Sequence, residues 1–379
     1  MAYGWWSRAA VATLVVLSLS CARVYRPTLE EAAISSPWPF YRGDLASRGY
    51  VNSGKFNGEL DIVWQHEEAD KPAGPLTIYG GSLVYPGTRN RIRFYDCRSG
   101  KERGFVNSRG AAQTGVVIYD SLAIFATAPP KSWLRCLNLY TGQQKWKRRV
   151  KDAAAGSIIV DGKLIVGTTD GRLSAYRIAD GNSVWVFEAK SGLVASPGFE
   201  NGRIIQATDG GRLYAVQSSD GTQTLQAAVR GPVVGVGVAD MIYATDMTGY
   251  VYAIDPSSGQ VVWETHAGGP VWTSPAVTTE RVIVGDSGGR LTALDSRTGA
   301  VLWQFDTGDV VKASPIVVGE YVIVGTLSGK LFSLTALDGR LVEQKEFDGA
   351  IAVSPVSDGD RVYIASEKGT IAALGTSHE

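Results

Sequence analysis

Few residues of this 379-residue chain have the type and spacing that catalysis or metal binding requires. Its three histidines, His66, His266 and His378, are too scattered along the sequence to suggest one set of metal ligands. No Gly-x-Ser-x-Gly nucleophile motif and no nucleotide-binding glycine loop occurs. The sequence therefore predicts neither a catalytic residue nor a metal site.

Cys21 is the residue with the clearest chemical role. Arg8 is followed by a short apolar run and then by Ser20-Cys21, a pattern typical of a secretory signal peptide over residues 1–20. Residues 17–21 (LSLSC) resemble a bacterial lipobox, in which the cysteine is lipidated and becomes the first residue, although Ser18 stands where leucine is commonest. We expect lipidation of Cys21. The alternative is an ordinary signal peptide with an incidental cysteine.

By analogy with such lipoproteins, Ala22 after the cysteine favours the outer membrane. Cys97 and Cys136 fall at different positions of the repeat described below, so we expect two separate thiols rather than a disulfide. Their oxidation in an exported protein stays open. The chain has 37 basic and 37 acidic residues, and this balance gives no reason to expect a nucleic-acid partner.

A repeat of about 40 residues dominates the rest of the chain. The loop glycines recur with nearly constant spacing, at Gly171, Gly211, Gly249, Gly289, Gly329 and Gly369. Each unit contains four short β-patterned runs, as in residues 311–317, 321–325, 330–334 and 340–347. This content is typical of a propeller blade. The sequence predicts an all-β fold, an eight-bladed propeller of four-stranded antiparallel blades.

The eight innermost strands are expected to begin near Pro75, Gln113, Ala155, Ala195, Val234, Thr273, Ala313 and Ala352. The last unit ends before its fourth strand, but residues 62–65 (IVWQ) copy residues 301–304 (VLWQ). An N-terminal strand is therefore predicted to complete the last blade and close the ring. Residues 21–58 would form a lipidated lead-in segment, and residues 59–379 the propeller.

Residues that recur in most units are interpreted as scaffold. Tryptophan recurs on the fourth strand, where an indole can stitch one blade to the next, at Trp64, Trp146, Trp185, Trp263 and Trp303. Serine–proline pairs recur on the first strand, where proline is tolerated at an edge facing the central channel, at residues 196–197, 274–275, 314–315 and 354–355.

The unit G-x-L-x-A-L-D-x-x-T-G-x-x-x-W, seen at residues 289–303, resembles the repeat of pyrroloquinoline-quinone (PQQ) type β-propellers over about residues 60–375. Residues 38–44 (WPFYRGD) also resemble a segment that often precedes the first blade in such proteins. Two functional classes share this repeat. They are the PQQ-dependent dehydrogenases and non-enzymatic scaffolds best known from the BamB family of outer-membrane assembly lipoproteins.

The resemblance to the dehydrogenases implies a vicinal cysteine pair, a calcium site and a catalytic aspartate. The sequence has no adjacent cysteines, and we find no carboxylate cluster outside the repeats. Asp255 and Asp295 occupy a repeated turn position. We therefore expect no cofactor and no enzymatic activity.

The resemblance to BamB implies a periplasm-facing, lipid-anchored scaffold of the outer membrane. Its partner would be an envelope protein, in particular an outer-membrane β-barrel assembly protein. That family contacts its partner through loops with an arginine beside leucines and with paired aspartates. The matching loops here, residues 189–195 (AKSGLVA) and 230–235 (RGPVVG), have neither feature. The alternatives are a quinoprotein dehydrogenase, or a propeller that binds an envelope polymer or another partner.

Two surfaces are candidates for partner binding. The loops that join the fourth strand of one blade to the first strand of the next open on one face, and there the repeat is broken by Lys190, Leu193, Arg230, Trp272 and Lys312. Trp272 has the alternative of packing in the central channel. The second surface is a basic stretch on an outer strand, Lys145, Lys147, Arg148, Arg149 and Lys151. It is interpreted either as charge protection of a sheet edge or as a contact with lipid phosphates, polysaccharide or an acidic partner.

Overall fold

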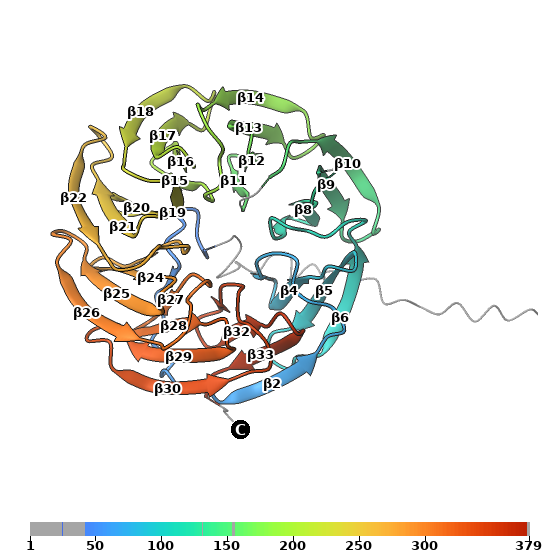
Figure 1. Ribbon diagram of the computed structural model, residues 1–379. Helices are drawn as coiled ribbons and strands as arrows, with labels where there is room; N and C mark the ends of the chain where they lie inside the picture. Colours follow the sequence, from blue (N-terminus) through green and yellow to red (C-terminus); the bar gives the residue numbers. More distant parts are fainter. Residues whose placement is uncertain (1–24, 26–41, 131, 154–155, 377–379) are drawn as a thin grey trace, which may run out of the picture.

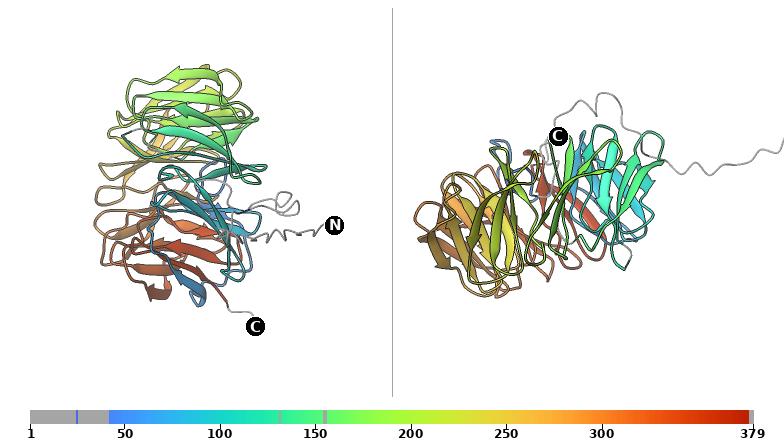
Figure 2. Two further views of the ribbon diagram at one scale, coloured as in Figure 1. Left: turned by 90° about the vertical axis from the view of Figure 1, so that its right-hand side faces the viewer. Right: turned by 90° about the horizontal axis from the view of Figure 1, so that it is seen from above.

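The computed structural model describes residues 25, 42–130, 132–153 and 156–376, and these residues form eight antiparallel sheets arranged in a ring (Figure 1). Each sheet contains four antiparallel strands, and one gains a fifth, parallel strand. The predicted eight-bladed propeller is confirmed. The expected signal peptide, Cys21, Ala155 and His378 lie outside the described residues. Views along the edge of the ring show the sheets standing side by side around one axis (Figure 2).

The blades are numbered in chain order, and their four strands run from the channel to the rim. The first four blades comprise β3 (Thr77–Tyr79), β4 (Ser82–Pro86), β5 (Arg91–Asp96) and β6 (Glu102–Asn107); β7 (Val117–Tyr119), β8 (Leu122–Ala126), β9 (Trp133–Asn138) and β10 (Gln144–Arg149); β11 (Ile158–Val160), β12 (Lys163–Gly167), β13 (Arg172–Arg177) and β14 (Ser183–Glu188); and β15 (Gly198–Glu200), β16 (Arg203–Ala207), β17 (Arg212–Gln217) and β18 (Gln223–Ala228).

The other four blades follow the same order. They comprise β19 (Val233–Val238), β20 (Ile242–Asp246), β21 (Tyr250–Ile254) and β22 (Val261–His266); β23 (Ala276–Val277), β24 (Arg281–Gly285), β25 (Arg290–Asp295) and β26 (Val301–Asp306); β27 (Ile316–Val318), β28 (Tyr321–Gly325), β29 (Lys330–Thr335) and β30 (Leu341–Glu346); and β31 (Val356–Ser357), β32 (Val362–Ala365), β33 (Thr370–Leu374) and β2 (Ile62–Glu67).

The innermost strands are shorter than the sequence predicts. In blade 7 the expected strand 311–317 is replaced by β27, which begins only at Ile316. The residues before it contain Ser314-Pro315, and their polar groups bond sideways to the next blade instead of into their own sheet. The Ser314 backbone N–H donates to Ser354 Oγ at 3.0 Å, and the Ser274 N–H donates to Ser314 Oγ at 2.9 Å. Proline has no N–H to contribute to a strand ladder, and the N–H of the preceding serine is satisfied by the serine hydroxyl of the next blade.

The recurring tryptophans join five of the eight blades to the next blade at the rim. Trp303 on β26 lies against Gly339 in the hairpin of blade 7, and its indole N–H donates to the Ala336 carbonyl at 3.0 Å. The same bond is made by Trp64, Trp146, Trp185 and Trp263, at 2.7 to 3.1 Å. All five indoles are at least nine-tenths buried. A tryptophan at this position thus buries a large apolar surface and satisfies its own donor.

The ring closes through β2, as predicted. This strand pairs antiparallel with β33, and Ile62 faces Leu374 in the register in which Val301 faces Leu294 in blade 6. Trp64 then bonds to the Cys97 carbonyl of blade 1, which is the first blade of the ring. The N-terminal strand therefore carries the same blade-to-blade bond as the strands that it copies.

A second N-terminal segment ties the inner strands together. Residues 45–51 cross the ends of four successive blades, and β1 (Tyr50–Val51) pairs in parallel with β27. The carbonyls of residues 45, 46, 48 and 49 accept hydrogen bonds from the backbone N–H groups of Phe199, Val238, Val277 and Val317 at 2.7 to 2.9 Å. Each donor belongs to the innermost strand of its blade. The chain before the propeller is thus part of the folded ring.

Deletion of residues 58–68 should abolish cooperative unfolding or cause aggregation. The deletion removes β2 and leaves the fully buried strand β33 as an open edge of blade 8. Urea unfolding followed by tryptophan fluorescence, with light scattering, measures the effect.

The matched control returns the deleted segment to the C-terminus after Gly375, through a copy of the 295–300 hairpin. Because β2 and β33 have the register of β26 and β25, this permuted chain should recover a single cooperative transition. A deletion variant as stable and as monomeric as the wild type contradicts the shared-strand closure.

Candidate partner-binding face

One face of the ring is built by the loops that lead from the rim strand of one blade to the inner strand of the next. At the start of these loops the backbone N–H groups of Ala189, Val229, Ala267 and Thr307 donate to the carbonyls of Gly171, Gly211, Gly249 and Gly289, at 2.7 to 2.9 Å. Those glycines have positive φ and sit in the turn between the second and third strands. Each loop is therefore fixed to a turn of the preceding blade, and the face presents side chains from a rigid frame.

Leu193 belongs to this frame and not to the exposed surface. Its backbone N–H donates to the Thr168 carbonyl at 3.1 Å, as Val311 does to Asp286 and Ile351 to Thr326. The side chain is fully buried and packs in the core between blades. This finding corrects the expectation that Leu193 contacts a partner, because its side chain has no surface to offer.

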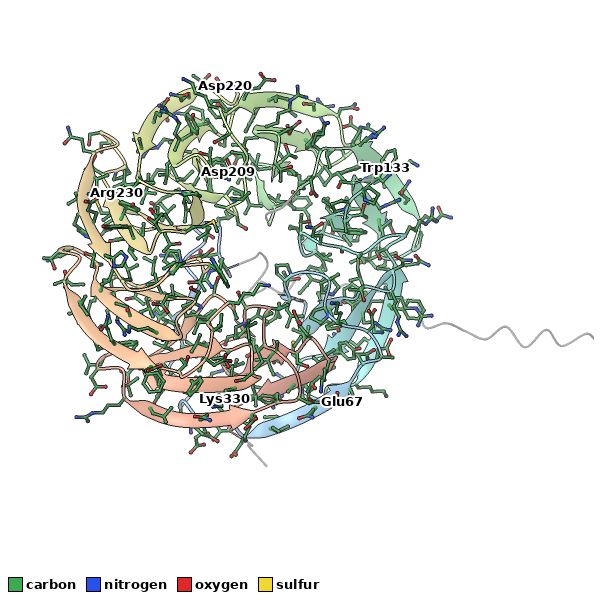
Figure 3. All side chains as sticks on the ribbon, in the orientation of Figure 1. Glu67, Trp133, Asp209, Asp220, Arg230 and Lys330 are labelled. Carbon is green, nitrogen blue, oxygen red and sulfur yellow. The ribbon has the colours of Figure 1, made fainter. Side chains whose placement is uncertain are left out.

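Arg230 is exposed beside the rim of blade 5 (Figure 3). Its Nε atom lies 3.1 Å from Glu264 Oε2, and its guanidinium lies over the ring of Tyr250, 5.1 Å from the centroid. The hydrogen bonds from Arg230 lower the pKa of Glu264, and the same pair raises the pKa of Arg230. The guanidinium of Arg230 is thus held in a fixed position at the surface, where a partner can offer it a further hydrogen-bond acceptor.

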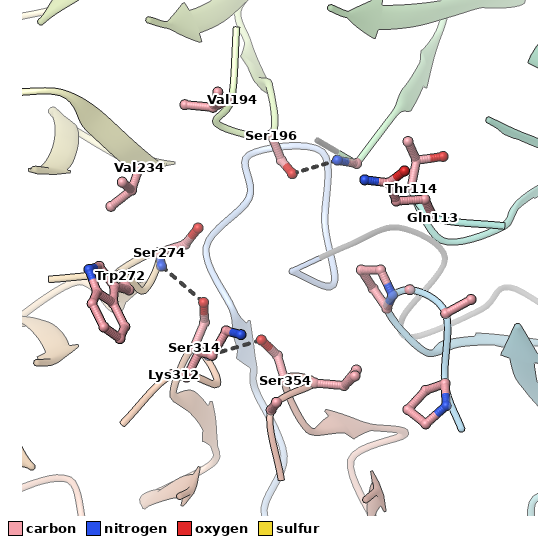
Figure 4. Close-up of a pocket in the computed structure, with 17 residues that line it drawn as sticks. Gln113, Thr114, Val194, Ser196, Val234, Trp272, Ser274, Lys312, Ser314 and Ser354 are labelled. Carbon is pink, nitrogen blue, oxygen red and sulfur yellow. Dashed lines mark hydrogen bonds between the residues drawn. The ribbon is translucent and has the colours of Figure 1, made fainter. Parts of the chain in front are cut away.

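Trp272 and Lys312 both line the cavity at the centre of the ring (Figure 4). They help to line this cavity of about 250 Å³ together with the serines that precede the inner strands, Ser196, Ser274, Ser314 and Ser354. Trp272 is 45% exposed, so the channel does not enclose its indole. Lys190 is also exposed, but neither it nor Arg230 lines this cavity. The structure thus places two of the five expected residues on the lining of one cavity and two others on separate loops of the ring.

One buried residue of the frame, Arg42, is not among the residues that the sequence predicts for a site. Arg42 is 1% exposed, and its Nη2 donates to the Pro275 carbonyl at 2.9 Å. Its carbonyl accepts the Gly49 N–H at 2.8 Å, and a side chain at Gly49 would overlap the guanidinium. The segment that holds Arg42 and Gly49 is the pale loop that crosses the channel in Figure 4. Arg42 belongs to the segment 38–44, whose resemblance to a lead-in segment of the family is the one sequence feature that points to it.

The basic stretch lies on the rim, where it was expected. Lys145, Lys147 and Arg149 are exposed on β10, and Lys151 is exposed just after it. Arg148 is half-buried and donates to the Asp180 carbonyl and to Asn182 of blade 3, both at 2.8 Å. Four of the five side chains are therefore available to a ligand, and Arg148 also joins two blades.

The donor groups for metal or quinone chemistry are not gathered at the channel. Within the described ranges, no group of three or more His, Cys, Asp or Glu side chains is placed to hold a metal ion. Lys312 is the only charged residue among the described residues that line the cavity. A quinone with several carboxylates needs more cationic partners, and the cavity is smaller than the roughly 300–1,000 Å³ of ordinary ligand sites. The residues here do not fit that cofactor.

The two cysteines of the propeller are separate, buried thiols. Burial raises the pKa of both thiols to about 12, and at Cys97 the nearby Asp358 carboxylate adds to the effect. Both stay protonated at neutral pH and have little reactivity as nucleophiles.

Among the described residues, no helix is long and apolar enough to span a bilayer.

The ring, its glycine turns and its tryptophan bonds define the chain as a PQQ-like β-propeller. A family profile described as outer membrane protein assembly factor BamB matches residues 55–187, 170–241 and 226–379. The chain belongs to this family.

Individual relatives are distant and fall into both functional classes. Outer membrane protein assembly factor BamB of Yersinia pestis is 26% identical over 217 residues, covering 50% of this chain and 55% of that protein. Quinoprotein alcohol dehydrogenase PedH of Pseudomonas putida is 29% identical over 175 residues, covering 38% and 29% respectively. The match thus spans little more than half of the first relative and under a third of the second.

Solved structures show the same fold. The crystal structure of BamB from Moraxella catarrhalis superposes with a TM-score of 0.72 at 19% identity, covering 84% of this chain and 100% of that one.

Substitution of Arg42 by alanine should lower the free energy of unfolding by roughly 2–3 kcal/mol, because it removes a buried hydrogen bond from a charged donor. Trp272→Ala should change it by about 0.5 kcal/mol or less, as expected for an exposed side chain. Urea denaturation of both variants measures the difference. Equal losses would contradict the assignment of Arg42 to the frame and of Trp272 to the surface.

Proposed function

We propose that this chain is a non-enzymatic, lipid-anchored scaffold on the periplasmic face of the outer membrane, and that it acts in the assembly of outer-membrane β-barrel proteins. Family membership supports this function, because the matching profile and the Yersinia pestis relative carry the name of an outer-membrane assembly factor. The lipobox-like sequence before Cys21 supports the anchor.

The observation that carries the proposal is the rigid loop face with exposed anchor residues. Arg230 and Trp272 are of the types that dominate protein interfaces, and backbone hydrogen bonds fix the loops that present them. A partner that docks there loses little free energy to loop ordering. Lys190 and Lys312 add positive charge on the same face, which suits a partner segment with acidic side chains.

A quinoprotein dehydrogenase is the second candidate, since a relative of that name shares the repeat. The residues at the channel argue against it, because Lys312 alone offers a charged partner to the carboxylates of such a cofactor. A propeller that binds an envelope polymer is the third candidate, favoured only by the basic residues of β10.

Cys21 should carry the acyl chains. Cells fed a fatty-acid analogue should label the wild-type protein, while Cys21→Ser should remain unlabelled. A matched variant, Ser20→Thr, keeps the thiol and should still be labelled. Equal labelling of wild type and Cys21→Ser, or labelling of neither, would contradict the lipid anchor.

The loop face should hold the partner. Simultaneous replacement of Lys190, Arg230, Trp272 and Lys312 by alanine or serine should strongly reduce the recovery of proteins crosslinked in membranes. The melting temperature should stay close to that of the wild type, because all four side chains are exposed. A matched control replaces four exposed residues of the rim strands, Val262, Leu302, Leu341 and Val342, by serine.

One outcome would contradict the loop face as the binding surface, and another would contradict the scaffold function itself. The first is unchanged recovery in the loop variant together with loss in the rim control. The second, which contradicts the scaffold function, is a rise in melting temperature with PQQ and Ca²⁺ accompanied by oxidation of alcohols or sugars. A ligand at 100 times its Kd stabilises a protein by about 2.7 kcal/mol, so binding would be easy to detect.

A further inference from the structure

Tyr25 is fixed to the rim of blade 1, only four residues after the cysteine expected to carry the lipid. Its backbone N–H donates to the Phe105 carbonyl on β6 at 3.1 Å. Its ring stacks on Phe94 of β5, with the centroids 3.8 Å apart and the planes 5° from parallel. The side chain is 1% exposed. Tyr25 is therefore packed into the propeller.

Tyr25 fills a position where the repeat lacks its tryptophan. Gly104 faces Phe94 in the register in which Trp303 faces Ala293, so blade 1 has no side chain of its own at the stitching position. The Tyr25 ring lies instead in the core between blades 1 and 2, in one cluster with Leu137 and Leu139 of blade 2. Packing between these two blades thus includes Tyr25.

This contact limits the distance between the propeller and a lipid on Cys21. Four residues span at most about 14 Å when fully extended, at roughly 3.3–3.6 Å for each residue. The acyl chains of a lipidated Cys21 must therefore enter the bilayer within about that distance of the rim of blades 1 and 2. The opposite rim, at blade 6, has no such constraint.

The blades nearest to Tyr25 carry an excess of positively charged side chains. Residues 71–151, termed here the basic sector, contain fifteen lysines and arginines but only three aspartates and glutamates. Since the whole chain is balanced at 37 of each, the remainder carries the opposite excess. Within the described part of the chain, no ion pair shorter than 4 Å involves the exposed side chains of Arg89, Arg91, Lys145, Lys147, Arg149 and Lys151.

Aromatic rings lie beside two of these cations. The Arg91 guanidinium lies 4.4 Å from the ring centroid of Phe105, and Lys147 Nζ lies 4.6 Å from that of Trp133. Trp133 is labelled in Figure 3. Rings next to basic side chains are typical of surfaces that lie at a membrane interface, where the ring meets the headgroups and the cation meets the phosphates.

We infer that the basic sector docks edge-on against the anionic lipid headgroups of the membrane that holds the acylated Cys21, with Tyr25 as the fixed attachment point. The inference rests on the proposed lipid anchor. The sector offers an unneutralised cationic surface, and an anionic leaflet attracts such surfaces over a distance of about a Debye length, or 8–10 Å at ordinary salt. The axis of the ring then lies along the membrane, and the loop face points sideways toward neighbouring membrane proteins.

Energy transfer from a dye to labelled headgroups tests this orientation in the full-length, acylated protein. One variant carries the dye at Gln143→Cys, in the exposed hairpin before β10, and a second carries it at Leu302→Cys, on the opposite rim. Because Cys97 and Cys136 are buried thiols, the dye reacts with the introduced cysteine. On vesicles of phosphatidylglycerol and phosphatidylcholine, transfer should be strong from position 143 and weak from position 302.

Charge variants then identify the surface. Replacement of Lys145, Lys147, Arg149 and Lys151 by glutamate should abolish the difference between the two dye positions. The matched reversal of Arg290, Arg297, Lys330 and Arg340 on blades 6 and 7 should preserve it. Vesicles of phosphatidylcholine alone, or salt near 1 M, where the Debye length falls to about 3 Å, should also abolish it.

The role of Tyr25 is tested separately. Tyr25→Ala should loosen the orientation and reduce the difference, whereas Tyr25→Trp, which keeps a large ring at the stitching position, should restore it. Circular dichroism confirms that each variant is folded.

Wild-type protein that is acylated at Cys21 but shows equal transfer from both positions overturns the docking surface and leaves the scaffold function standing. Transfer that survives reversal of the rim charges, while capture of a crosslinked protein is lost, also overturns it and assigns the basic sector to a protein partner.

Discussion

The ring depends on one contact repeated around its circumference, the side chain that packs each rim strand onto the hairpin of the next blade. A propeller blade is a small twisted sheet, and it buries its faces only against its neighbours. The indole of Trp303 fills the space over Gly339 and satisfies its N–H at the Ala336 carbonyl. A gap at any one interface would expose the faces of two sheets, so every interface must be filled.

The interfaces without tryptophan show how strict this constraint is. In blade 4 the position belongs to Leu225, which packs beside Gly259. In blade 7 it belongs to Glu343, whose carboxylate accepts the backbone N–H of Leu60, two residues before β2, at 2.5 Å. In blade 1 it belongs to Gly104, and Tyr25 fills the space. Two of the three exceptions are thus covered by residues that precede β2, so Tyr25 and Leu60 are part of the packing of the ring.

The fold could be predicted from the sequence because its determinants repeat. The spacing of the glycines and the copy of residues 301–304 at residues 62–65 were enough to predict eight blades and their closure, since a repeated local pattern requires a repeated local structure. The contributions of Arg42 and Tyr25 could not be predicted in this way. Each occurs once and contacts residues far away in the sequence, Pro275 and Phe94, which no periodic pattern relates to it.

The same distinction explains why the surface was harder to predict than the core. Leu193 differs in type from the residues at its repeat position, Val311 and Ile351, and this difference is the reason that the sequence predicts a partner contact there. Its backbone bond and its burial are nevertheless those of its equivalents, because the core accepts aliphatic side chains of different shapes at one position. A change between aliphatic residues therefore carries little information about function. A change in charge or exposure, as at Arg230 or along β10, is more informative, because it alters the surface that the ring presents to a partner or a membrane.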